Sequence, residues 1–146
     1  MRRLLFLCAL PLAAALPSQQ EALALAFPGA TVTRRDHPAA FEARSGGKLV
    51  GVAFFDTHRV RAQMETAMVA IGADGRILRV EVVAFSEPAE YMARGAWLRQ
   101  FDGKREEVVL GRTIKPLAGS TLTAAALTDA AKRALAQFQA LYGAAR

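Results

Sequence analysis

Apolar and polar positions along the chain follow two different spacings. Alternation with a period of two is typical of a strand with one covered face, and apolar residues three or four apart are typical of an amphipathic helix. These spacings predict strands over 31–33, 49–55, 64–71 and 76–85, and helices over 18–27, 90–101 and 122–142. The order of the elements predicts an α+β fold in which an antiparallel β-meander sheet packs with a long C-terminal helix and shorter helices in a single domain.

The last two predicted strands give the clearest hairpin. Residues 64–71 are apolar on both faces, which indicates a central, covered strand. Asp74-Gly75 is the signal of a tight turn. On the strand that follows, one face is predicted to carry Leu78, Val80, Val82 and Ala84, and the other Arg79 and Glu81. Glu65 lies in the apolar strand, so if it is buried it needs a hydrogen-bond donor, for example Arg61.

Other segments have weak periodicity and are predicted to be connections. Residues 34–45 are predicted to be irregular, Gly46-Gly47 a turn, and Asp56-Thr57-His58 a link between strands. The polar stretch 104–113 is predicted to join the last two helices and to hold a short strand at 108–110.

The N-terminus has the features of an export signal. Two arginines precede an apolar run from Leu4 to Leu16, and small residues at Ala13-Ala14-Ala15 suit a signal peptidase. The run falls short of the roughly 20 residues that span a bilayer. We therefore expect residues 1–17 to be a signal peptide and the protein to be exported, to the periplasm or another extracytoplasmic space. Retention of this segment as a membrane anchor is the alternative.

Composition and charge narrow the classes of function. The chain has 146 residues, 53% of them apolar, and a formal charge of +6, which fits one modest domain. Its basic residues form no dense run, so nucleic-acid binding is not expected. The single cysteine, Cys8, lies in the predicted signal, and His37 and His58 lack a ligand-like spacing, so no metal site is expected. After the predicted signal, we expect the chain to divide into an N-terminal helix with a connecting segment, residues 18–47, and a main domain, residues 48–143.

A hydroxyl-rich turn precedes the longest predicted helix. Pro116 keeps Lys115 extended, and Gly119 permits a tight turn or the close approach of a ligand. Ser120, Thr121 and Thr123 follow, and each is able to cap a helix. A helix start carries free N–H groups and the positive end of the helix dipole, so it suits a phosphate. The alternative is a plain helix cap without a ligand.

Several motifs occur in one order between residues 48 and 142. They are the hairpin 64–85 with Asp74-Gly75, the Glu87-Pro88 step, Trp97-Leu98-x-Gln100-Phe101-x-Gly103-Lys104, and the turn Ala118-Gly119-Ser120-Thr121-Leu122-Thr123. This order resembles the FMN-binding domain family, which includes the flavin subunits of Rnf-type and sodium-pumping NADH:quinone complexes and small exported flavoproteins. The resemblance implies FMN as the cofactor. It also implies redox partner proteins, among them a membrane electron-transfer complex, and a flavin transferase.

In that family the turn reads Asp-x-x-(Ser/Thr)-Gly-Ala-(Thr/Ser), and the transferase joins the last hydroxyl to the FMN phosphate. The match puts Gly119 at the glycine, Ser120 at the alanine and Thr121 at the acceptor. Lys115 replaces the Asp, and Ala118 replaces the Ser or Thr. Covalent and non-covalent FMN therefore both stay open, and in the second case Lys115 would pair with the phosphate.

The remaining candidates for cofactor contact are Leu122 and Thr123 beside the acceptor, Glu87 and Tyr91 at the flavin ring, and His58. For His58 the alternative is a loop histidine at a strand end. The resulting hypothesis is an exported FMN-binding electron-transfer protein rather than a stand-alone enzyme, and no catalytic residue is predicted. The alternatives are a flavin-free exported module that binds a ligand or partner, and a membrane-anchored accessory subunit of a redox complex.

Overall fold

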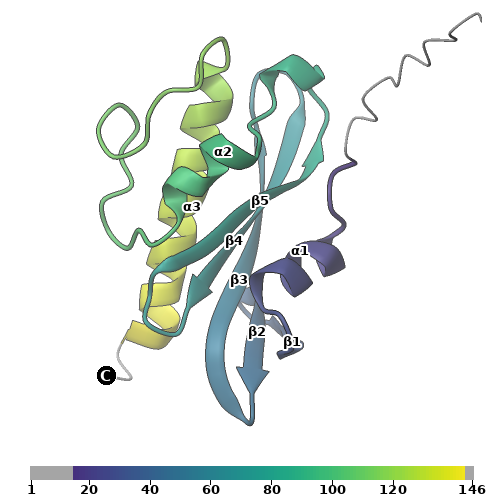
Figure 1. The fold of residues 1–146 in the computed structure, drawn as a ribbon, viewed down its shortest axis with the longest axis vertical. Coiled ribbons are helices and arrows are strands. Elements are labelled where there is room, and N and C mark those ends of the chain that lie inside the picture. Colours follow the sequence, from purple (N-terminus) through teal and green to yellow (C-terminus); the bar gives the residue numbers. More distant parts are fainter. Residues whose placement is uncertain (1–14, 144–146) are drawn as a thin grey trace, which may run out of the picture.

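The computed structural model describes residues 15–143, so most of the predicted export signal lies outside the described residues. Five strands form one antiparallel sheet in which each strand pairs with its neighbour in sequence (Figure 1). The strands are β1 (Thr31–Asp36), β2 (Ala39–Ser45), β3 (Lys48–Arg59), β4 (Met64–Gly72) and β5 (Ile77–Phe85). The predicted antiparallel meander is confirmed.

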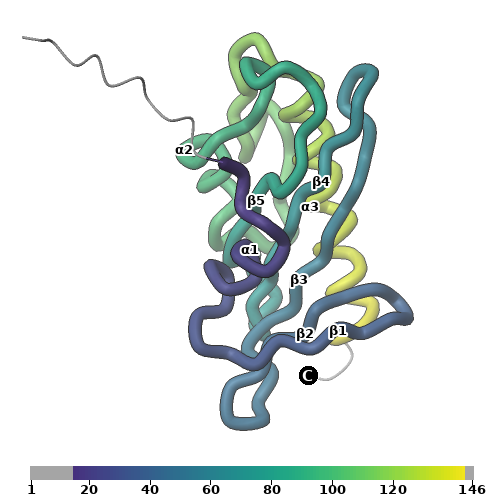
Figure 2. The backbone as a smooth tube through the Cα atoms, turned by 90° about the vertical axis from the view of Figure 1, so that its right-hand side faces the viewer, coloured from purple at the N-terminus to yellow at the C-terminus, as the bar shows by residue number. Residues whose placement is uncertain are grey.

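The helices lie on opposite faces of this sheet, which gives three layers (Figures 1 and 2). They are α1 (Gln19–Ala26), the 3-10 turn η1 (Ala89–Tyr91), α2 (Gly95–Leu98), the 3-10 turn η2 (Arg99–Phe101) and α3 (Thr121–Tyr142). Helix α1 covers one face, and α3 covers the other together with α2 and η2. None of the helices within residues 15–143 has the combination of length and apolar content that a membrane span requires.

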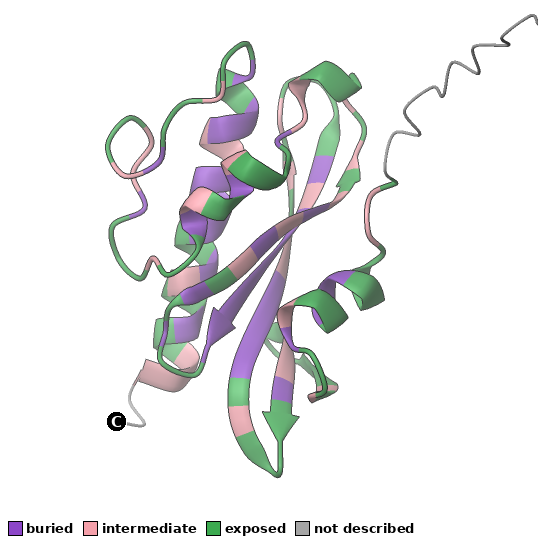
Figure 3. Cartoon of the chain, in the orientation of Figure 1, coloured by how far each residue is buried: buried purple, intermediate pink, exposed green. Residues whose placement is uncertain are grey.

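Strand β4 is covered on both sides, as its sequence predicts. Val69 and Ile71 pack under α3, in the larger core that includes Leu127 of that helix. Met68 and Ala70 point the other way, into the smaller core under α1. Figure 3 shows buried stretches, in purple, along the strands in the middle of the sheet and along α3.

Helix α1 lies over β4 and β5, and the residue that ends it, Phe27, reaches β3. Ser18 caps α1 through a capping box with Glu21, as expected for a Ser followed by Glu three residues later. At the other end Phe27 lies on Gly51 of β3, where a Cβ would come within 2.4 Å of the Phe27 ring. Glycine at 51 therefore lets the helix end approach the sheet.

Two predictions about the first strands are wrong. Residues 34–45 are not irregular: they complete β1 and form β2, which pair around the turn at His37-Pro38. This hairpin is rich in alanine and charged residues, so it lacks the β-branched pattern that marks a strand. Residues 56–58 are not a connection either, because β3 continues to Arg59. Residues 56–58 are polar, so this end of the strand lacks the apolar pattern that predicts a strand from the sequence.

The predicted alternation on β5 is wrong near both ends of the strand. Val80 and Val82 are buried, but Leu78 is 43% exposed and Ala84 is exposed. The pairing with β4 shifts register twice, once at each of these positions. An extra residue in a β-bulge reverses the side that later residues face, so a strict period of two does not hold along the whole strand.

The predicted helix over 90–101 is broken into η1, α2 and η2, with Arg94 extended at φ −127° and ψ 168°. In a continuous helix the carbonyls of Glu90 and Tyr91 would accept N–H groups four residues ahead. Instead they accept hydroxyl groups of Ser120 and Thr123. By contrast, the prediction of the last helix is confirmed, and α3 begins one residue earlier than predicted.

Candidate functional site

Helix α3 begins at Thr121, directly after a tight turn. The Ser120 N–H donates to the Leu117 carbonyl over 3.0 Å, and Gly119 takes φ +73° inside this turn. That angle favours glycine. Among residues 15–143, no atom outside Gly119 and its two chain neighbours lies within 4 Å of the place a Cβ would occupy at Gly119, so the approach to the helix start is open at this point.

The hydroxyls at the helix start divide into two groups. Thr123 is buried and donates to the Tyr91 carbonyl over 2.8 Å, and Ser120 is buried with its Oγ 3.5 Å from the Glu90 carbonyl. Ser120 makes no side-chain capping bond to the first turn. Thr121, by contrast, is exposed. The N–H groups of the first turn are therefore open to an outside acceptor, with the Thr121 hydroxyl beside them.

The segment that leads to this turn is held in place at Lys115. The indole N–H of Trp97 donates to the Lys115 carbonyl, and the Lys115 N–H donates to the Gln100 side chain, both over 2.8 Å. Trp97 also meets Phe101 edge-on at 5.5 Å between ring centroids. Trp97 is thus a loop anchor, while the side chains of Lys115 and Ala118 are exposed.

Glu87 joins two segments that are far apart in sequence. Its Oε1 accepts the backbone N–H groups of Arg61, Ala62 and Gln63 at 2.8–3.1 Å. These hydrogen bonds, that from Gln63 above all, hold the pKa of Glu87 below its usual range. The β3–β4 turn is thereby fixed against the segment that carries Tyr91, and the Arg61 guanidinium lies 4.4 Å from the centre of the Tyr91 ring.

His58 lies within β3 and belongs to a set of charged side chains between the sheet and α3. Its Nδ1 is 2.8 Å from Asp56 Oδ1, and its Nε2 is 3.0 Å from Glu65 Oε2. Arg133 of α3 donates two hydrogen bonds to the Asp56 carboxylate, one to Oδ2 over 2.7 Å and one to Oδ1, which His58 also contacts, over 2.8 Å. We call Asp56, His58, Glu65 and Arg133 the charge network; Glu65 is its buried end and Arg133 its exposed end. The donor to Glu65 is thus His58, and the sequence-based expectation of an arginine such as Arg61 is wrong.

The geometry of the network favours a charged imidazole. A histidine that donates to two carboxylates at once must carry both ring protons. Burial opposes this charge, but the hydrogen bonds to Glu65 and Asp56 outweigh it and raise the pKa of His58. The guanidinium of Arg133 lowers the pKa of Asp56. Glu65 is completely buried, and its Oε1 has no hydrogen-bond partner among the described residues.

The network meets α3 away from the start of the helix. Arg133 follows Thr121 by twelve residues, which is about 18 Å along the helix axis. Within residues 15–143 no group of His, Cys, Asp and Glu is arranged to hold a metal ion.

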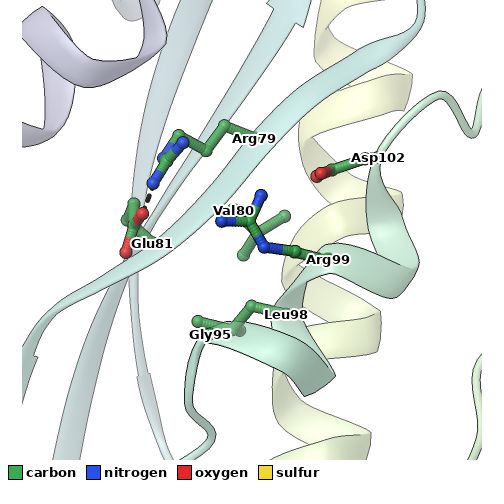
Figure 4. A pocket seen from close by; sticks show the side chains of 7 residues that line it. All are labelled: Arg79, Val80, Glu81, Gly95, Leu98, Arg99 and Asp102. Carbon is green, nitrogen blue, oxygen red and sulfur yellow. Dashed lines mark hydrogen bonds and ion pairs between the residues drawn. The ribbon is translucent and has the colours of Figure 1, made fainter.

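A small pocket lies between β5 and the α2–η2 segment (Figure 4). Its volume is about 30 Å³, whereas sites for small organic ligands measure roughly 300–1,000 Å³. Arg79 and Glu81 form an ion pair at its rim over 2.6 Å, and burial raises the pKa of Asp102 on the opposite side. This pocket is too small for a flavin.

Comparison with known proteins identifies the family. The sequence profile described as the FMN-binding domain matches residues 62–136, from the β3–β4 turn into α3. The chain belongs to the FMN-binding domain family. FMN is therefore its cofactor. The matched range includes Glu87, Tyr91, Lys115 and the start of α3, whereas His58 lies before it.

A solved structure shares the fold of this FMN-binding domain. The crystal structure of Shewanella oneidensis NqrC aligns with a TM-score of 0.54 and 17% sequence identity. The alignment covers 76% of this chain and 66% of the NqrC chain, so the present chain spans somewhat less than two thirds of that protein. No curated protein matches the chain.

The residues at the start of α3 fit the phosphate end of FMN. They supply uncapped N–H groups, an exposed hydroxyl on Thr121 and open space over Gly119. Leu122 beside them is 49% exposed, and Tyr91 is half-buried on the adjoining segment. An apolar surface next to a phosphate-binding helix start is what a flavin needs.

Sequence reasoning missed how the parts of this region are joined. Thr123 and Ser120 were grouped with Thr121 as candidates, yet their side chains turn inward to the 87–91 segment. Arg61 was not a candidate at all. The Glu87-Pro88 step did indicate that Glu87 could bind backbone N–H groups, because acidic side chains often do so at turns. That Glu87 accepts from the turn at 61–63 could not be seen in the sequence, because strand pairing brings the two segments together.

Proposed function

We propose that this FMN-binding domain protein is an exported electron carrier that holds the FMN phosphate at the start of α3. The observation that carries the proposal is the exposed Thr121 at an uncapped helix start, inside the matched range of the family. The N–H groups of the first turn would hold the phosphate, and Leu122 and Tyr91 would offer apolar surface to the flavin ring. Bound FMN supplies the electron-accepting and electron-donating chemistry, and the protein orients it.

The covalent form of the proposal assigns Thr121 as the point of attachment. A flavin transferase would join the Thr121 oxygen to the phosphorus of an activated flavin donor. The new O–P bond replaces the bond to the donor's leaving group, and the hydroxyl proton passes to a base. Thr121 is suited to this reaction because its side chain is exposed, whereas Thr123 is buried and donates to Tyr91.

The non-covalent form is favoured by the two departures from the family's turn. Lys115 and Ala118 stand where the family has an acidic and a hydroxyl residue. The backbone of Lys115 is fixed by Trp97 and Gln100 while its side chain is exposed. An ammonium group on a fixed segment would pair with the phosphate of dissociable FMN.

The deciding experiment uses the full chain, expressed for export with a flavin transferase. The protein is denatured, viewed on a gel under ultraviolet light and weighed intact. A fluorescent band with the mass of one esterified FMN is expected for the covalent form. Thr121→Ala should abolish that label and Thr121→Ser should keep it, because serine retains the hydroxyl. Continued labelling of Thr121→Ala would reject Thr121 as the acceptor.

A dark band from yellow native protein would establish dissociable FMN. In that case Lys115→Gln should weaken FMN binding, and the double variant Lys115→Asp, Ala118→Ser should gain the label. A colourless protein would contradict the whole proposal and favour a flavin-free binding module.

Export and partners are part of the same proposal. The predicted signal at residues 1–17 supports export, and the family supports redox proteins, including a membrane electron-transfer complex, as partners. The mass of the N-terminus of protein from the periplasmic fraction tests the first point. A mature chain that begins near Ser18 is expected, and a chain that retains Met1 in the membrane fraction would show an anchored form.

A further inference from the structure

We propose that Arg61 is part of the flavin site and stabilises the reduced, anionic flavin ring. This inference rests on the proposed function, because it takes FMN to be bound at the start of α3. Arg61 lies one residue before the range that matches the family, so neither the match nor the turn at Gly119 assigns it a role.

Three segments meet around the helix start, and side-chain hydrogen bonds hold them together. Glu87 fixes the backbone of the turn at 61–63 through three N–H groups. Thr123 and Ser120 fix the carbonyls of Tyr91 and Glu90 to the first turn of α3. The β3–β4 turn, η1 and the start of α3 therefore form one connected surface, although each is about 25 to 30 residues from the next along the sequence.

Arg61 places its positive charge on this surface. Its guanidinium lies over the Tyr91 ring at 4.4 Å, the residue is exposed, and among the described residues the guanidinium makes no hydrogen bond or ion pair. A guanidinium that rests on one aromatic ring can take a second flat ring on its other side. Tyr91 thus holds Arg61 in position, and none of the described residues accepts a hydrogen bond from its guanidinium.

One acidic group also lies near Arg61. The carboxylate of Glu87 interacts electrostatically with Arg61, and that attraction contributes to the lowered pKa of Glu87. One oxygen of Glu87 is already occupied by three backbone N–H groups. Glu87 therefore acts mainly on the backbone of the turn.

Reduction of the flavin would increase the negative charge on the ring beside Arg61. Two electrons and one proton from water would convert the oxidised ring to a reduced ring that carries one more negative charge. In the titration described below, the electrons come from the electrode. A cation beside the ring stabilises the reduced form more than the oxidised form. Arg61 should therefore raise the midpoint potential of the bound flavin.

The test compares the midpoint potentials of FMN-loaded wild type, Arg61→Gln, Arg61→Lys and Lys48→Gln by spectroelectrochemical titration, with FMN content measured in each. Lys48 is exposed at the opposite end of the twelve-residue strand β3. This is roughly 40 Å away along the strand and far beyond the Debye length of about 10 Å. Lys48→Gln therefore removes one charge without touching the site.

We expect Arg61→Gln to shift the equilibrium about tenfold toward oxidised flavin, a fall of about 30 mV for a two-electron couple. Arg61→Lys should stay near wild type because it keeps the charge, and Lys48→Gln should equal wild type. The turn should stay folded in Arg61→Gln, since Glu87 binds the backbone N–H, which glutamine retains. Loss of FMN from a folded Arg61→Gln, with FMN retained in Lys48→Gln, would also support a contact with the flavin.

An unchanged potential in fully loaded Arg61→Gln would overturn the role of Arg61 and leave the proposed function intact. An equal fall in Lys48→Gln would overturn it as well, because the effect would then reflect net charge. Failure of the wild type to take up FMN would overturn the proposed function and this inference together.

Discussion

Two regions of helix α3 use polar side chains in opposite ways. At the start of the helix, N–H groups and the Thr121 hydroxyl face outward without a capping side chain. Near its middle, Arg133 joins the charge network, where the groups pair with one another. The start is therefore open to a ligand, whereas the network joins α3 to the sheet. We infer that changes to the outward-facing groups at the start alter binding and changes in the network alter stability.

The largest loss of stability is expected from Glu65→Ala. Removal of one partner of a buried ion pair costs up to about 3–5 kcal/mol, and here His58 would lose its hydrogen bond to the completely buried Glu65 and keep only the one to Asp56. Urea unfolding would measure the loss. Glu65→Gln is the matched control, because its amide can still bond His58, and it should lose less. A loss below about 1 kcal/mol for Glu65→Ala would remove the distinction between the two regions.

A smaller effect is expected from the charge of His58. Because its folded-state pKa lies above the usual 6.5, the folded protein binds the proton more tightly than the unfolded chain does. This contribution to stability is fully present below about pH 6.5 and is lost as the pH rises through the raised pKa. The loss should be smaller than in Glu65→Ala, because a neutral imidazole keeps one hydrogen bond.

The free energy of unfolding of wild type and His58→Gln, measured from pH 6 to pH 9, would test this prediction. The wild type should lose stability across this range and His58→Gln should lose less. Parallel curves would show that His58 does not gain a proton on folding.

Thr123→Val should cost about 1–2 kcal/mol, because it removes a buried hydrogen bond at nearly constant volume and leaves the Tyr91 carbonyl without its donor. The same variant should weaken FMN binding, since this bond holds the 87–91 segment against the helix start. Thermal unfolding and an FMN titration measure the two effects. A variant as stable as wild type would mean that the segment is held by packing alone.

The smallest change in stability is expected from Thr121→Val, which should stay within about 0.5 kcal/mol of wild type because the side chain is exposed. Thr121→Val is the matched control for Thr123→Val, because it makes the same substitution two residues earlier at the start of α3. A comparable loss of stability in both variants would contradict the division between an outward-facing and an inward-facing hydroxyl.

The parts of the fold that follow from local pattern could be predicted from the sequence. Helix α3 has an apolar stripe through Leu127 and Phe138, and α1 has one through Ala22 and Leu23, so both were found close to their observed bounds. The β4–β5 hairpin followed from Asp74-Gly75 and two apolar strands. In each case residues near in sequence determine the structure.

The parts that depend on distant partners could not be predicted. Asp56 and His58 look like loop residues until Arg133 and Glu65 are placed beside them. The break at 92–94 depends on hydroxyls about 30 residues later, at Ser120 and Thr123. For the candidate site, the turn at Gly119 and the acceptor position of Thr121 were accessible from the sequence, but the place of Arg61 over Tyr91 was not.

The order of strands in the sheet also has a consequence for the path of folding. Every strand pairs with its neighbour in sequence across a short turn, so the sheet requires the closure of short loops only, which is entropically cheap and fast. The bonds from Ser120 and Thr123 to Glu90 and Tyr91 close much longer loops. The meander should thus assemble first, and the start of α3 should take its place last, on a sheet that already exists.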